Sequence, residues 1–314
     1  MNSRVKTCAS KLQFELFPFA PFRLDLTAWV LKRRPEDELH QWDGEYFRRV
    51  FVVQGSAMLV EVKQVAAGAN PRLLVTVPHP ARQENLENCL IEILNQVLGL
   101  NIDLTSFYEL SLREPRLAEL AIRFRGVKPP RFPSVFECFV CAVACQQLSL
   151  HVGILLLNRL VETFGQSAAG TQQRAFPRPN ILARADVDQL KAMSFSTNKA
   201  RYIIEMARAI ETGEIKLNDY ANLNDADLKG QLTGIRGIGK WTAEYMMLRG
   251  YGKIDAYPID DSGARSKLKK FLALNSDMDR QELQAVVNLW KPYSGLLYFH
   301  VLLYLLAEEG HVKC

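Results

Sequence analysis

The chain has 314 residues, of which 48% are hydrophobic and 23% are charged, and its net charge is +5. This composition excludes an intrinsically disordered chain, and the length is enough for one large or two medium domains with substantial cores. The mildly positive charge permits a polyanionic partner without requiring one.

Neither end of the chain suggests a membrane protein. Residues 1–14 lack the uninterrupted apolar core of a signal peptide. The longest apolar run, Leu296 to Ala307, is too short to cross a bilayer and contains His300. We therefore expect a soluble monomer in the cytoplasm, associated with the nucleoid if it binds DNA, with no membrane partner.

Residues 1–112 predict a small α+β domain. Apolar and polar residues alternate in short runs, as they do in strands of an antiparallel sheet with one buried face. We find no catalytic constellation in this part and interpret it as a scaffold. The expected strands lie at 12–16, 48–53, 60–63 and 73–77, with a turn near Gly55 and a loop at 67–71, and the expected helices at 24–32 and 84–98.

From about Arg113 the pattern is almost wholly helical. Pro129, Pro130 and Pro133 form a rigid connector, and helices are expected at 199–211 and 279–289. The predicted fold class is therefore α+β, with an N-terminal antiparallel sheet domain followed by an all-helical domain at 113–314.

Three of the six cysteines, Cys138, Cys141 and Cys145, fall on one face of an apolar helix. An iron or zinc site has to be considered, but this spacing is unusual for a metal and a fourth ligand is missing. Free cysteine commonly behaves as a small buried hydrophobic residue. We expect no metal site here.

The stretch from Gln231 to Phe271 carries the clearest motifs. Two helices, 224–232 and 240–249, flank a turn with Gly234, Gly237 and Gly239. Such a turn exposes backbone N–H groups at the positive end of the second helix and suits a phosphate. The alternatives are a corner without a ligand and a nucleotide-binding loop, although the latter requires a preceding strand and Ser or Thr in place of Trp241.

Two further features follow the turn. Trp241 and Tyr245 lie four residues apart, so both rings share one helix face, either as core packing or as the wall of a pocket. The carboxylates of Asp260 and Asp261 precede a basic helical pattern, where each would stay ionised as a helix cap. Both could be caps without a further role.

These residues carry a family resemblance. The run LTGIRGIGKWTAEYMMLRG, followed by PIDD, resembles the helix-hairpin-helix and catalytic aspartate of the HhH-GPD DNA glycosylase superfamily that includes endonuclease III. The nearest match is the 3-methyladenine DNA glycosylase II type. WKPYSGLLYFH resembles its C-terminal helix, and FRGVKPPRFPSVFE with the glutamines that follow resembles its central region, so the likeness covers about the last two thirds of the chain.

The resemblance implies roles for individual residues. Asp261 would be the catalytic carboxylate because it stands 22 residues beyond Gly239, whereas Asp260 fits the shorter spacing of the 8-oxoguanine branch. Gln147 would fill the gap left by a flipped base. The expected DNA-binding residues are Gln146, Gln147, Gly237, Gly239, Lys240 and Arg265, and the expected base pocket consists of Trp241, Tyr245 and Leu302, the last standing where relatives place an aromatic residue.

The expected function is excision of a damaged base from duplex DNA. An aromatic pocket favours alkylated, positively charged purines of the 3-methyladenine type, through cation–π attraction on the order of 1–2 kcal/mol. In the branch that also cuts the strand, a lysine stands where this chain has Trp241, and Lys240 would point about 100° away around the helix. This predicts a monofunctional glycosylase.

Two alternatives remain open, an 8-oxoguanine or other damaged-purine glycosylase and a non-catalytic DNA-binding module. No organic cofactor is implied. By resemblance, a monovalent cation could be held by carbonyl groups of the hairpin.

Overall fold

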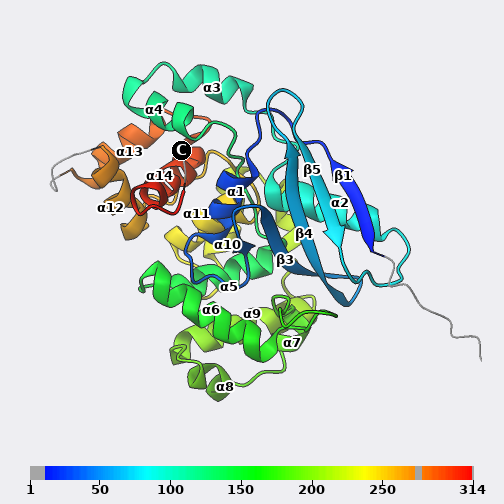
Figure 1. Ribbon diagram of the computed structural model, residues 1–314. Helices are drawn as coiled ribbons and strands as arrows, with labels where there is room; N and C mark the ends of the chain where they lie inside the picture. Colours follow the sequence, from blue (N-terminus) through cyan, green and yellow to red (C-terminus); the bar gives the residue numbers. More distant parts are fainter. Residues whose placement is uncertain (1–10, 273–277, 313–314) are drawn as a thin grey trace, which may run out of the picture.

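The computed structural model describes residues 11–272 and 278–312. A five-stranded antiparallel sheet in the order β1-β5-β4-β3-β2 occupies one side of the molecule, and helices make up the other side (Figure 1). The predicted fold class is confirmed. The strands are β1 (Leu12–Leu16), β2 (Gln41–Trp42), β3 (Tyr46–Val53), β4 (Ser56–Ala66) and β5 (Arg72–Val77).

The longest strand pair, β3 with β4, follows directly from the local sequence. A tight turn at Gln54 and Gly55 joins the strands, and both residues have positive φ angles, 45° and 87°. Such a turn matches the twist of an antiparallel hairpin. Val60 and Val62 of β4 are fully buried, whereas Glu61 between them is half-buried on the other face. The alternation seen in the sequence therefore sets which face meets the core.

Helices account for most of the remaining chain, and the predicted ones are present with small differences at their ends. The helix expected from residue 84 begins at Leu86. The helices of the first half are α1 (Leu24–Lys32), α2 (Leu86–Leu98), α3 (Thr105–Ser111), α4 (Pro115–Arg123), α5 (Val135–Cys145), α6 (Leu150–Phe164) and α7 (Pro179–Leu182). Those of the second half are α8 (Val187–Ala192), α9 (Thr197–Glu211), the short 3-10 helix η1 (Leu217–Asn222), α10 (Asp225–Thr233), α11 (Lys240–Arg249), α12 (Ser262–Phe271), α13 (Arg280–Asn288) and α14 (Ser294–Glu308).

Helix α1 links two hydrophobic cores. Leu24 and Leu31 pack in the core between the sheet and α2, whereas Leu26 and Val30 pack in the core formed with α3, α4 and α11–α14. Because α1 is buried on both sides, its C-terminal end lies in the interior of the molecule. Helices α1 and α3 thus pack on C-terminal helices, and the domain boundary at residue 112 stays a prediction.

A cluster of four buried charged or titratable side chains joins the sheet side to helix α5. We call Asp37, His40, Arg49 and Glu137 the buried charge cluster. The guanidinium of Arg49 on β3 donates to both carboxylate oxygens of Glu137 on α5, at 2.5 and 2.7 Å, and also contacts His40. The Nδ1 atom of His40 lies 3.0 Å from Asp37. Every member thus has a partner inside the protein.

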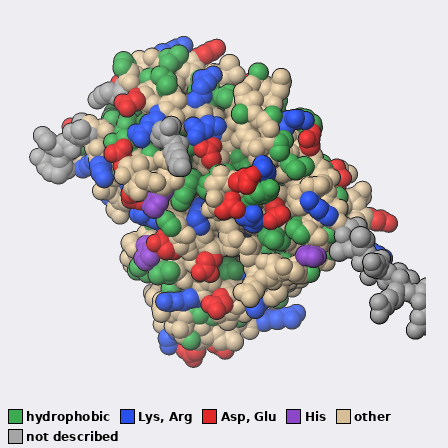
Figure 2. Space-filling view, viewed as in Figure 1, with side chains coloured by type: hydrophobic (Ala, Val, Ile, Leu, Met, Phe, Trp, Pro, Cys, Tyr) green, Lys and Arg blue, Asp and Glu red, His purple; other side chains and the backbone are tan. Residues whose placement is uncertain are grey.

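The surface carries no large patch of one charge on the face shown in Figure 2, where acidic and basic side chains are interspersed. Among the described residues, no helix combines the length and the apolar character needed to cross a membrane.

Candidate active site

The glycine turn between α10 and α11 has the geometry expected of a helix-hairpin-helix. Helix α10 begins after Asn224, whose side chain accepts a hydrogen bond from the Asp227 N–H, and it leads straight into the turn. Since a helix and not a strand precedes the loop, the geometry is not that of a nucleotide-binding loop. The second helix ends at Arg249 as expected, and Gly250 is its C-cap.

Two glycines of the turn have different surroundings: Gly237 has no room for a side chain, and Gly239 faces open space. Gly237 has a φ angle of 88°, and a Cβ atom there would lie 2.6 Å from the ring of Tyr202. Gly239 precedes the first turn of α11, and no atom lies within 4 Å of where its Cβ would be. The first N–H groups of a helix have no partner within it, so the outer side of Gly239 is open to an anion.

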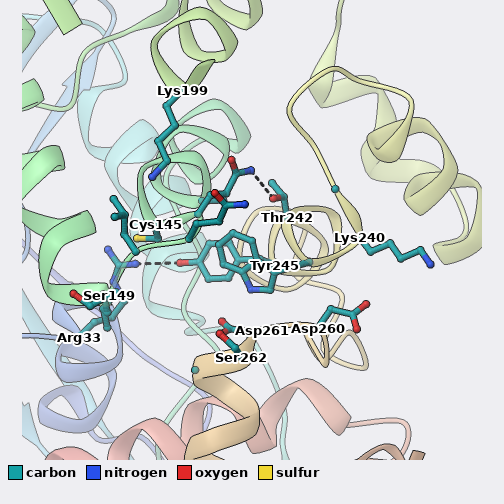
Figure 3. A pocket seen from close by; sticks show the side chains of 18 of the residues that line it. Arg33, Cys145, Ser149, Lys199, Lys240, Thr242, Tyr245, Asp260, Asp261 and Ser262 are labelled. Carbon is teal, nitrogen blue, oxygen red and sulfur yellow. Dashed lines mark hydrogen bonds between the residues drawn. The ribbon is translucent and has the colours of Figure 1, made fainter. Parts of the chain in front are cut away.

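Gln146 fixes the turn to the end of helix α5. Its side-chain amide donates to the Gly237 carbonyl at 2.9 Å. It also donates to the Thr242 hydroxyl at 3.0 Å, the bond drawn to Thr242 in Figure 3. The neighbouring residue Gln147 is exposed and has a φ angle of 55°, which is rare for a residue with a side chain. The Gln146 side chain is thus hydrogen-bonded within the protein, whereas Gln147 lies at the surface.

Two carbonyl groups of the hairpin, those of Gly237 and Gly239, accept one hydrogen bond each. The Gly237 oxygen accepts from Gln146, and the Gly239 oxygen accepts from the Ala243 N–H at 2.9 Å. A carbonyl oxygen has two lone pairs, so each of these oxygens can accept one further contact.

A cavity of about 1190 Å³ opens beside the hairpin. It brings together residues from the hairpin, the α5–α6 turn, the N-terminus of α12 and the ends of α1 and α14. Of the residues predicted as site residues, those that line it are Gln146, Gln147, Gly239, Lys240, Trp241, Tyr245, Asp260 and Asp261.

The two adjacent carboxylates have different surroundings. Asp261 is the N-cap of α12, where its Oδ1 atom accepts from the Ala264 N–H at 3.0 Å. Asp260 is bound by the Arg280 guanidinium at 2.7 Å, and this hydrogen bond holds the pKa of Asp260 below its usual range. Figure 3 shows Asp261 below the ring of Tyr245, with Asp260 farther out near Lys240.

Aromatic rings form one wall of the cavity. The ring centroids of Trp241 and Tyr245 are 5.8 Å apart, and that of Tyr298 on α14 lies 6.4 Å from Tyr245 in an edge-on arrangement. Leu302, expected in the pocket, is buried in the core around α14 and does not line the cavity. It lies one helical turn beyond Tyr298, which takes the place at the cavity instead.

Two other predicted contacts lie elsewhere. The Arg265 guanidinium donates to the Ile259 carbonyl at 3.0 Å and does not line the cavity. Gly237 also lies outside the lining, behind the hairpin against Tyr202. Arg265 thus supports the start of α12 from within the protein.

Several cavity residues were not anticipated. Arg33, the C-cap of α1, donates from Nη1 to the Tyr245 hydroxyl at 3.2 Å (Figure 3). Lys199 lines the cavity and donates to the Ala144 carbonyl at 2.9 Å, and burial lowers its pKa. Lys267 on α12 lines it as well. No local motif marks Arg33, because only the packing of α1 brings it here.

The cysteine helix is part of the core. Cys138 and Cys141 are buried among apolar side chains, and burial raises the pKa of both thiols. Cys145 is half-buried and lines the cavity. Within residues 11–272 and 278–312, no group of three or more His, Cys, Asp or Glu side chains is placed to hold a metal ion.

Comparison with known proteins gives consistent matches. Residues 140–292 match the model of the HhH-GPD superfamily of base excision DNA repair proteins. A DNA-3-methyladenine glycosylase from Bacillus subtilis is 27% identical over 285 residues, which cover 89% of this chain and 93% of that protein.

Solved structures share the fold. The 3-methyladenine DNA glycosylase of Archaeoglobus fulgidus superposes with a TM-score of 0.80 at 22% identity and covers 93% of this chain and 97% of its own. An 8-oxoguanine glycosylase/lyase of Clostridium acetobutylicum, in complex with duplex DNA, superposes with a TM-score of 0.68 at 18% identity. The superposition covers 90% of this chain and 92% of that chain. With its hairpin, its aspartate at the cavity and these matches, the chain belongs to the HhH-GPD superfamily of base excision DNA repair proteins.

Proposed function

We propose that the protein is a monofunctional DNA glycosylase that hydrolyses the N-glycosidic bond of alkylated purines in duplex DNA and leaves an abasic site. The observation that carries this proposal is the position of Asp261. Its carboxylate caps α12 inside a cavity whose wall is the aromatic face of α11 and whose edge is the glycine hairpin. A base must leave the stack before its glycosidic bond can be reached, and the cavity offers a place for it.

In the proposed mechanism, the hairpin binds a backbone phosphate through the N–H groups at the start of α11, with Lys240 adding a point charge. Exposed Gln147 would occupy the space that the base leaves. The flipped base would lie against Trp241 and Tyr245. In this mechanism the hairpin binds the DNA backbone at the surface, and the cavity binds the flipped base.

Asp261 is the carboxylate that we assign to the chemical step. As the glycosidic bond breaks, positive charge develops on the sugar, and an ionised carboxylate nearby stabilises that charge and can orient the attacking water. Asp260 is a weaker candidate because Arg280 already neutralises it at the surface. The proposed reaction needs no organic cofactor.

The names of the relatives support alkylated purines as substrates, since the Bacillus subtilis protein is a DNA-3-methyladenine glycosylase. Strand cleavage would need a lysine amine to form a Schiff base. Trp241 occupies the position of that lysine, and Lys240 is exposed and points away from Asp261 in Figure 3. This supports a hydrolytic, monofunctional reaction.

The test is base release from duplexes that carry N-methylated purines, with the wild type compared with Asp261→Asn and Asp260→Asn. We expect Asp261→Asn to lower the rate by about 10²–10³, whereas Asp260→Asn should retain most of it. Borohydride should trap no protein–DNA adduct.

Other outcomes would contradict the proposal. Release of 8-oxoguanine that is lost with Asp260→Asn would assign the protein to the oxidised-purine branch. Tight DNA binding without release of any base would identify a non-catalytic binding module.

A further inference from the structure

Part of the cavity wall is rich in hydrogen-bond donors. Arg33, Trp241 and Tyr245 all line it. Within the described part of the chain, the buried Nε atom of Arg33 and the buried Nε1 atom of Trp241 meet no acceptor. The Tyr245 oxygen accepts from Arg33, so its own proton remains to be donated. Buried donors without acceptors are costly, which points to a ligand that supplies acceptors.

Arg33 is held rigidly in this position. It is only 4% exposed, its φ angle is 61°, and its guanidinium lies 5.8 Å from the ring centroid of Phe132. The helix before it is packed between two cores, which fixes the position of its backbone. Its donors are therefore a fixed feature of the pocket.

We propose that Arg33 is a specificity-determining residue that favours damaged purines with a carbonyl oxygen at C6 over those with an exocyclic amine there. This inference rests on the proposed function. A carbonyl oxygen accepts from the guanidinium, whereas an amine would place donor against donor and leave both unpaired. The preference concerns the C6 group and not the charge of the base.

Methylated DNA provides a matched comparison. It contains 7-methylguanine, with a carbonyl at C6, and 3-methyladenine, with an amine at C6, and both bases are cationic in DNA. We would measure release of both from the same DNA by the wild type, Arg33→Met and Arg33→Lys. We expect Arg33→Met to lower the ratio of 7-methylguanine to 3-methyladenine released by about tenfold or more, with Arg33→Lys in between because it keeps a donor.

An equal loss of both bases, with the ratio unchanged, would overturn the inference and leave Arg33 as a support for Tyr245. Failure of the wild type to release either base would overturn the proposed function itself. The two failures are thus distinguishable.

A second measurement needs no variant. Free hypoxanthine and free adenine are both neutral and differ in the C6 group and the proton on N1. Wild-type protein should bind hypoxanthine about tenfold more tightly or better. Equal affinities would overturn the inference, even if the Arg33 variants do not fold.

Discussion

Charged and polar groups serve opposite purposes in two regions of this protein. In the buried charge cluster, Arg49 and Glu137 are about 1% and 5% exposed in their side chains and are bound to each other. At the hairpin rim, which we define as Gly239 and Lys240, the lysine is exposed, and no described residue forms a salt bridge with it. The opposite charges of the cluster are paired within the protein, although the Arg49 Nε atom has no acceptor there, and the rim is left open.

The difference shows how a site can be both precise and accessible. Groups that fix the relative position of the sheet and α5 must be paired, because an unpaired buried charge is strongly destabilising. Groups that bind a ligand must instead remain in water until the ligand arrives. Changes in the cluster should therefore alter stability, and changes at the rim should alter DNA affinity.

The largest effect is expected from Glu137→Gln. It leaves the Arg49 guanidinium buried without a counter-charge and should lower the free energy of unfolding by about 3–5 kcal/mol. Urea unfolding measures this loss. The control is Glu205→Gln, whose exposed pair with Arg236 should contribute less than about 1 kcal/mol. Equal small losses in both variants would remove the distinction between the two regions.

Acid should also act on the cluster. Burial lowers the pKa of His40 to about 4 from its ordinary 6.5, and Arg49 acts in the same direction against the opposing effect of Asp37. The unfolded chain then takes up the proton first as the pH falls. The stabilising contribution of neutral His40 is complete above pH 6.5 and is lost as the pH falls toward 4, by about 3 kcal/mol.

This is measured by urea unfolding at pH 7 and pH 4 for the wild type and for His40→Gln. The wild type should lose more stability than the variant by about that amount. An identical loss in both would show that His40 does not couple folding to pH.

Gly237→Ala tests the geometry of the turn that carries the rim. A positive φ angle with a side chain costs about 1–2 kcal/mol, and the new Cβ would also displace Tyr202. The control is Gly213→Ala, with a φ angle of 77° and no atom within 4 Å. We expect both variants to lose stability and only Gly237→Ala to lose DNA affinity, as measured by fluorescence anisotropy. Equal DNA affinity of the two variants would contradict a role for the hairpin.

The smallest effect is expected from Lys240→Ala. Removing one phosphate contact should weaken DNA binding by on the order of threefold to tenfold and lower the slope of log K against log salt by about 0.9. Lys191→Ala is the control, because this exposed lysine on α8 pairs with Asp188 and does not line the cavity. The same salt slope in both variants would exclude a specific contact at Lys240.

The sequence by itself determined most of the elements and the chemical motif. Strand alternation in 60–63 and 73–77, the glycine turn and the capping aspartate Asp261 are local patterns, and each depends on residues within a few positions of one another. The hairpin helices and the N-cap at Asp261 therefore agree with the prediction.

The tertiary structure alone decided what the cavity contains. Arg33 reaches Tyr245 across 212 positions of the sequence because α1 packs between two cores. Tyr298 and Leu302 lie one turn apart on the same face of α14, but only Tyr298 borders the cavity, because the packing of this helix buries its next turn in the core. Local patterns fix which residues form a helix, but which turn of a wholly apolar helix borders a cavity depends on the elements packed around it.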